Sequence, residues 1–234
     1  MDTQIMPFVR PAPVLELDVI ADFACPWSYL GKRSLERALG QLYGAPPRTL
    51  RWHGLPLSEV RAGPQTWEEY LSGRLPKGVS VGDAHQSLAA AGEELGIHFD
   101  FDRLKTLPDT REAHRLVRIA VREGRDAEVV EALFAAFFER GLDIGSKDVL
   151  RQIAAEAGLS DAGLKAYEAS DEGADEVESE VRRLRSLGVH AVPNLLINGR
   201  ILVPGPADSN VYVHALDQAL FPQDAEEAPP PRLH

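Results

Sequence analysis

Apolar and polar residues alternate in two short stretches near the N-terminus, separated by a helical pattern. Residues 14–22 alternate apolar with acidic side chains and then become apolar, which predicts a β-strand. After Pro26, apolar residues recur on one helical face as far as Leu42, and residues 49–53 form a second short strand pattern. A strand, a helix and a strand at this spacing predict a βαβ unit, in which the two strands are parallel.

The pattern changes after Pro56, where a long central segment reads as a series of helices without a convincing strand. The helical stretches are 83–95, 109–124, 126–140, 146–157 and 171–187, and glycines punctuate their ends. Asp109 with Glu112 three residues later predicts a capping box at the start of the second helix. We expect the many acidic residues of these helices to form solvated faces, caps and i,i+4 pairs.

Strand patterns return near the C-terminus. Residues 195–197 and 201–203 flank Asn198-Gly199, which predicts a hairpin with a type I′ turn, and a last helix is expected over 208–220. The chain therefore predicts an α/β fold with one four-stranded mixed sheet. We expect the domain that carries this sheet to be discontinuous, over 12–56 and 188–221, with a helical insertion domain at 57–187 between its two parts. Residues 222–234 are acidic and proline-rich and are expected to form a disordered tail.

Cys25 is the only cysteine of the chain, and it stands where the first strand runs into the first helix. Free backbone N–H groups and the helix dipole at that position favour a thiolate, so we expect a lowered pKa. Ser28 lies one turn further along and can hydrogen-bond the sulfur, but it cannot close a disulfide. The chemistry open to Cys25 is a mixed disulfide with an outside thiol such as glutathione, non-covalent binding of glutathione, or no redox chemistry.

A second candidate feature is Ala191-Val192-Pro193-Asn194, directly before the third predicted strand. A cis peptide bond at Pro193 would expose the backbone of Val192 for pairing with an extended thiol substrate. We also expect Trp27, which follows Pro26 in the cysteine motif, to be partly exposed and to face the substrate.

Three segments together carry a family resemblance. They are Asp22–Arg33 (DFACPWSYLGKR), Asp109–His114 (DTREAH), and Gly188–Pro193 (GVHAVP) followed by Asn198-Gly199-Arg200. These segments resemble the thioredoxin superfamily and, more closely, its DsbA-type branch with a helical insertion, the FrnE-like oxidoreductases. The resemblance implies a thioredoxin-like fold with a large all-helical insertion, Cys25 as nucleophile, Pro193 as a cis-proline, and the Val192 backbone as a substrate contact.

The chain departs from this pattern at Ser28, where redox-active members carry a resolving cysteine. Kappa-class glutathione transferases and 2-hydroxychromene-2-carboxylate isomerases share the architecture, and they resemble this stretch in a Ser-Pro-aromatic-Ser form. In that group an aspartate after the last strand helps to hold glutathione, and Asp208 is a weak match. His114 and His190 are further candidates for contacts with the substrate or Cys25.

Three functions therefore stay open. The first is a thiol–disulfide oxidoreductase with Cys25 as nucleophile and Ser28 as its hydrogen-bond partner. The second is a glutathione-dependent transferase or isomerase, in which Cys25 or Ser28 stabilises the glutathione thiolate. The third is a non-enzymatic binding or chaperone module that keeps the fold without turnover.

The composition of the chain limits the classes of molecule that it is expected to bind. The net charge of −11 over 234 residues disfavours nucleic acid and anionic membranes, because both attract basic surfaces. The seven histidines show no metal-binding spacing, and no apolar run is long enough to span a membrane. Without a signal-peptide pattern or a cysteine pair, we expect a cytoplasmic protein. Its partners would be protein or glutathione thiols and disulfides, with no permanently bound cofactor and a monomeric or homodimeric state.

Overall fold

The computed structural model describes residues 14–44, 46–57 and 65–222 of the chain, which form a mixed four-stranded sheet and surrounding helices. The strands are β1 (Leu15–Ala21), β2 (Arg48–Gly54), β3 (Asn194–Ile197) and β4 (Ile201–Pro204), in the order β2-β1-β3-β4. β1 and β2 are parallel, whereas β3 is antiparallel to both β1 and β4. This arrangement confirms the predicted βαβ unit and C-terminal hairpin.

The hairpin turn also has the predicted geometry. Asn198 and Gly199 both adopt positive φ angles, of 51° and 63°, as a type I′ turn requires. The Asn198 side chain adds a contact outside the hairpin, because its Oδ1 accepts a hydrogen bond from the backbone N–H of Glu16 at 2.8 Å. The turn therefore ties the hairpin to the start of β1.

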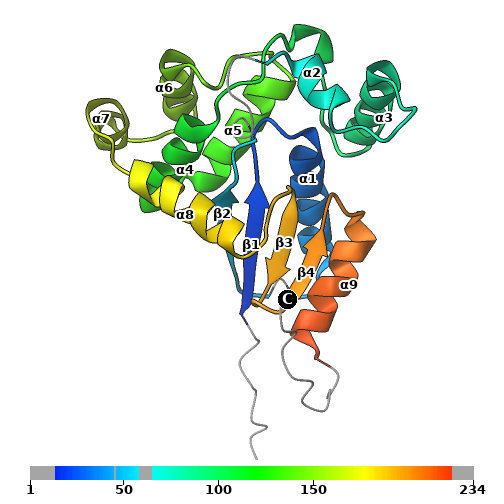
Figure 1. Cartoon of the computed structure of the whole chain (residues 1–234). Coiled ribbons are helices and arrows are strands. Elements are labelled where there is room, and N and C mark those ends of the chain that lie inside the picture. The colour runs from blue at the N-terminus through cyan, green and yellow to red at the C-terminus, as the bar shows by residue number, and fades with distance from the viewer. Residues whose placement is uncertain (1–13, 45, 58–64, 223–234) are drawn as a thin grey trace, which may run out of the picture.

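Helices cover the two faces of the sheet unequally (Figure 1). Helices α1 (Pro26–Gln41) and α9 (Ser209–Leu220) pack on one face, where Leu17 and Leu195 of the sheet share a core with Leu39 and Leu216. Helix α8 (Ala174–Ser186) packs on the other face, near β1 and β2. The first helix thus starts directly at the carboxyl end of β1, and α8 is the element of the central helical segment that contacts the sheet's second face.

The remaining helices lie over the carboxyl end of β1 (Figure 1). They are α2 (Trp67–Ser72), α3 (Val81–Glu94), α4 (Arg111–Glu123), α5 (Asp126–Phe138), α6 (Lys147–Glu156) and α7 (Asp161–Ala169), with a 3-10 turn at Phe101–Arg103. The sequence pattern did not predict α2 or α7, because six and nine residues are too few to show a helical period. Both begin with a side-chain cap, from Thr66 and Ser160.

The capping box expected at Asp109 is wrong. Helix α4 starts after Thr110, whose side chain makes no capping hydrogen bond. The carboxylate of Asp109 instead accepts hydrogen bonds from the backbone and side chain of Arg111, and Glu112 pairs with Arg115 at 3.0 Å. Asp109 therefore contacts the first N–H of α4, but the reciprocal contact from Glu112 that a capping box requires is replaced by its pairing with Arg115.

The predicted disordered tail lies outside the described residues apart from residue 222. Within the described ranges, none of the helices combines the length and the apolar character that crossing a bilayer requires.

Candidate functional site

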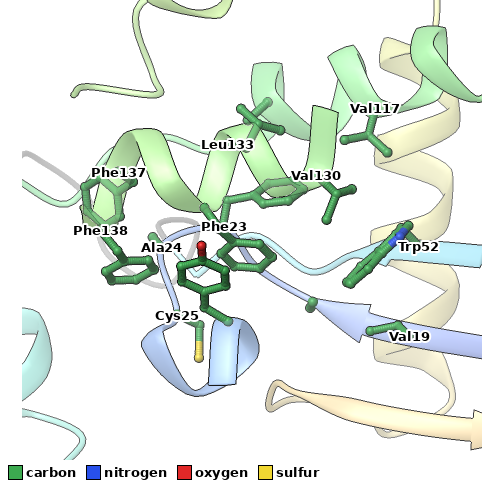
Figure 2. Close-up of a cluster of buried hydrophobic side chains, with 14 of the residues drawn as sticks. Val19, Phe23, Ala24, Cys25, Trp52, Val117, Val130, Leu133, Phe137 and Phe138 are labelled. Atoms are coloured by element: carbon green, nitrogen blue, oxygen red, sulfur yellow. The ribbon is translucent and has the colours of Figure 1, made fainter. Parts of the chain in front are cut away.

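Cys25 is the residue at which β1 gives way to α1. It occupies the N-cap of α1 with an extended backbone, and its backbone N–H donates to the carbonyl of Asp22 at 3.1 Å. The cysteine is only 2% exposed, and the aromatic residues of α5 pack over the Phe23–Cys25 loop. Figure 2 shows the sulfur pointing away from Phe137 and Phe138, towards the start of α1. The thiol is thus held at a helix N-terminus, as expected, but below the surface.

The Val192–Pro193 segment lies next to this thiol. The Sγ atom of Cys25 is 3.9 Å from the backbone carbonyl oxygen of Val192, and the Val192–Pro193 peptide bond is cis, as the resemblance implies. The carbonyl of Pro193 accepts a hydrogen bond from Gly205 at 2.8 Å, which links the segment to the end of β4. The structure therefore brings Cys25, Val192 and Pro193 together, although they are far apart in the sequence.

Ser28 is buried beside Cys25, with 1% of its surface exposed. Its hydroxyl hydrogen-bonds the cysteine sulfur and accepts a hydrogen bond from the backbone N–H of Asp22 at 3.4 Å. Pro26 is buried in the first turn of α1, whereas Trp27 is partly exposed, as predicted. Ser28 therefore occupies the place from which a second thiol would face Cys25.

Asp22 is a buried site residue that the sequence analysis did not select. Its side chain is fully buried, and its carboxylate accepts a hydrogen bond from the backbone N–H of Leu57 at 2.7 Å. The other carboxylate oxygen lies 3.2 Å from Nε2 of His114, which is 6% exposed. The available signal was the position of Asp22 at the end of an apolar strand, because a carboxylate buried at such a place needs a hydrogen-bond partner.

His114 reaches this position from α4. Its ring packs on Phe23, with centroids 4.6 Å apart, and rests against Gly54 at the end of β2. An added Cβ on Gly54 would approach the imidazole to 2.6 Å, so only glycine leaves room for the histidine. His114 therefore contacts Asp22 rather than the thiol, and it connects the helical segment to the site.

The pKa of Cys25 moves in the direction opposite to the one expected. Burial, with a smaller contribution from the negative charge of Asp22, raises the pKa of Cys25 to about 11. Hydrogen bonds from the Ser28 hydroxyl and from the backbone N–H groups of Ser28 and Trp27 lower it, as the helix N-terminus predicts, but they are outweighed. The prediction of a lowered pKa is therefore wrong, because the loss of water around the sulfur is the larger effect.

Two other predicted site residues, His190 and Asp208, make no hydrogen bond to Cys25 or Ser28 in the described part of the chain. His190 is exposed. Asp208 is the N-cap of α9, where its carboxylate accepts a hydrogen bond from the backbone N–H of Asn210 at 2.8 Å. Capping explains Asp208 without a ligand. Over the part of the chain that the structure describes, no group of three or more metal-ligating side chains is present.

The comparisons with known proteins agree with this geometry. The family model for a DSBA-like thioredoxin domain matches residues 16–217. The chain belongs to the DsbA-like thioredoxin domain family. A curated relative, the uncharacterised protein YwbO of Bacillus subtilis, is 24% identical over 209 residues, which cover 86% of this chain and 96% of YwbO.

Three solved structures show the same fold. A probable DsbA oxidoreductase from Streptomyces coelicolor has a TM-score of 0.79 at 24% identity, covering 92% of this chain and 93% of that one. A 2-hydroxychromene-2-carboxylate isomerase has a TM-score of 0.63 at 19% identity, covering 87% and 93%. The cytosolic disulfide reductase DsbM of Pseudomonas aeruginosa, solved with glutathione, has a TM-score of 0.57 at 20% identity, covering 87% and 95%.

Proposed function

We propose that this DsbA-like protein is a monothiol disulfide reductase that works with an outside thiol of the glutathione type. The observation that carries the proposal is the lone, buried Cys25 thiol at the start of α1, 3.9 Å from the Val192 carbonyl, with Ser28 in place of a second cysteine. A site of this kind can form a mixed disulfide, but it cannot release its substrate with a thiol of its own.

The raised pKa of Cys25 favours the reducing direction. DsbA-type oxidants are strong because their reduced form is stabilised as a thiolate. Here burial raises the pKa of Cys25 to about 11, so the thiolate is not stabilised and the disulfide-bonded form is favoured in comparison. A thiol of high pKa is also a poor leaving group, which makes its mixed disulfide persistent.

The reaction follows from these properties. The Cys25 thiolate attacks the glutathione sulfur of a glutathionylated protein; a Cys25–glutathione disulfide forms, and the protein leaves as a thiolate that takes up a proton. A second glutathione thiolate then attacks the glutathione sulfur of this disulfide, which gives oxidised glutathione and the Cys25 thiolate. The proton that Cys25 gives up passes to the solvent. In both steps the Val192 carbonyl and the partly exposed Trp27 flank the substrate.

A glutathionylated peptide tests this proposal. We expect the reduced protein to gain one glutathione on Cys25, seen by intact mass, and to lose it with excess reduced glutathione. The Cys25→Ser variant controls for surface chemistry and should gain nothing. A wild-type protein that releases no peptide thiol and gains no adduct would contradict the proposal.

One observation favours a second candidate, a glutathione-dependent isomerase or transferase. Cys25 is protonated at neutral pH, so Cys25 and Ser28 are two adjacent hydrogen-bond donors at a helix N-terminus, suited to holding the thiolate of a bound glutathione. The same experiment separates the two candidates. Calorimetric binding of reduced glutathione, without adduct formation from the glutathionylated peptide, would favour the second candidate. If the protein neither binds glutathione nor forms the adduct, a non-enzymatic binding module is favoured.

A further inference from the structure

Helix α8 carries a glutamate whose position differs from that of the other acidic residues around it. Glu180 is 13% exposed, and its carboxylate makes three contacts with other elements. It lies 2.6 Å from Nδ1 of His53 on β2, accepts a hydrogen bond from the backbone N–H of Gly54 at 3.1 Å, and pairs with Arg118 of α4. This one side chain thus joins α8, β2 and α4.

The Val192 segment, which contacts the Cys25 thiol, packs against the part of α8 that Glu180 attaches to β2. Val177, Val181 and Leu184 of α8 form a small core with Ile20 and Leu55, and Val192 packs against that core. The Val192 carbonyl in turn lies 3.9 Å from the Cys25 sulfur.

A second connection between Glu180 and the site runs through Gly54, at the end of β2. Its backbone N–H binds Glu180, and its Cα supports the ring of His114, which contacts Asp22. The Val192 carbonyl lies 3.9 Å from the Cys25 sulfur, and Asp22, the partner of His114, accepts the hydrogen bond of the Cys25 backbone N–H at 3.1 Å. Both segments that contact Cys25 are therefore supported at the junction of α8 with β2.

We propose that Glu180, through its pairing with His53, is a positioning residue that keeps the Val192 segment and the Asp22–His114 pair closed over Cys25. The inference concerns the thiol on which the proposed function rests, and it adds a residue that controls access to that thiol. Its readout is alkylation of Cys25, which requires no turnover, so the inference and the proposed function can fail separately.

His53 makes the closure depend on pH. Its Nε2 lies 2.8 Å from Asp18 of β1, so the ring stands between two carboxylates, Asp18 and Glu180. The other charged groups around it are Arg118 on Glu180, and Arg51, which bridges Asp18 and Glu16.

Burial lowers the pKa of His53, but the hydrogen bonds to Glu180 and Asp18 outweigh burial and raise it above 6.5. The ring is thus cationic at mildly acidic pH. As the pH rises through the raised pKa, the ring becomes neutral and its attraction for the two carboxylates is lost, so the closure weakens.

The test measures the rate of Cys25 alkylation by iodoacetamide against pH. Glu180→Gln keeps the shape and an acceptor for the Gly54 N–H but removes the charge, and His53→Gln removes the titrating ring. The matched control is Glu176→Gln on the same helix, which removes an exposed α8–α4 ion pair with Arg122 without touching β2. Circular dichroism melts check that each variant is folded.

We expect both test variants to be alkylated at least about tenfold faster than wild type at pH 6, where the His53 ring is cationic, because each unit by which the pKa of Cys25 falls on hydration gives a factor of ten. The control should stay within about twofold of wild type. The wild-type profile should also rise more steeply than one proton allows, and this extra step should vanish in His53→Gln.

Two results would overturn the inference. In the first, Glu180→Gln melts at a lower temperature but is alkylated at the wild-type rate, which would make Glu180 purely structural. In the second, Glu176→Gln accelerates alkylation as much as Glu180→Gln does. If Glu180→Gln does not fold, the same comparison is made with His53→Gln. A protein that turns over no glutathionylated peptide but shows the expected acceleration would remove the proposed function and keep the inference.

Discussion

The reactivity of Cys25 should follow its burial rather than its place at a helix N-terminus. The pKa of about 11 means that about one molecule in 10⁴ carries a thiolate at pH 7. An unfolded chain, with a cysteine pKa of about 8.5, would carry about 3% thiolate at the same pH. Because alkylation requires the thiolate, the folded protein should react about 300-fold more slowly than the unfolded one.

The assay compares iodoacetamide alkylation of the folded chain with that of the same chain in denaturant, from pH 6 to pH 10. Intact mass gives the extent of modification, and the single cysteine makes the product unambiguous. We expect the folded rate to rise by about tenfold or more per pH unit over the whole range without a plateau, whereas the unfolded rate levels off above about pH 9.

Restricted access of the reagent to the buried sulfur slows alkylation of the folded chain further. Burial therefore lowers the rate both through the raised pKa and through access. A plateau of the folded rate below pH 8.5, or a folded chain that reacts faster than the unfolded one at pH 7, would refute this reasoning. The hydrogen bonds from Ser28 and from the first turn of α1 would then outweigh desolvation, and the reducing direction of the proposed reaction would lose its support.

Three further predictions concern stability. Raising the pH from 8 to 11 should lower the unfolding free energy of wild type by about 3 kcal/mol relative to Cys25→Ser. The cysteine of the unfolded chain deprotonates first, whereas the folded one, with its raised pKa, stays protonated until about pH 11. Urea titrations at each pH measure the difference. Gly54→Ala should destabilise the fold by about 1–3 kcal/mol, since its Cβ would lie 2.6 Å from the His114 ring, whereas Gly40→Ala in α1, with open space around it, should be neutral or stabilising in the same thermal melts. Arg115→Met should cost about 3 kcal/mol or more in urea titrations, because the 2% exposed guanidinium donates to three backbone carbonyls that would lose their donor; a loss below 1 kcal/mol would contradict this account.

Local sequence signals were sufficient for the hairpin turn and for the start of the first helix, because both depend on neighbours in the chain. Asn198-Gly199 predicts a type I′ turn because few other residue pairs adopt two positive φ angles, and the structure has that turn. Pro26 after Cys25 predicts a helix start because proline has no N–H to leave unpaired, and α1 begins there. The mixed sheet followed from the order of these local elements.

The site could be predicted only in part, because its chemistry depends on contacts between distant segments. Asp22 and His114 are 92 positions apart, and nothing in either local pattern shows that they meet. Glu180 belongs to a run of charged residues that fits a solvated helix face, yet it is 13% exposed and faces β2. The pKa of Cys25 could not be predicted for the same reason, since desolvation depends on which side chains exclude water.

The two parts of the chain therefore have opposite effects on the thiol. The βαβ unit and the hairpin place Cys25 at a helix N-terminus, where backbone N–H groups stabilise negative charge on sulfur. The helical segment between β2 and β3 supplies His114 from α4, the aromatic cover from α5 and the support for Val192 from α8, and it closes the site. Closure removes water and lets the Asp22 charge act at short range, and these effects prevail. A substrate that displaces part of this cover would return water or hydrogen-bond donors to the sulfur, and the helix N-terminus would then stabilise the thiolate when a disulfide is in place to be attacked.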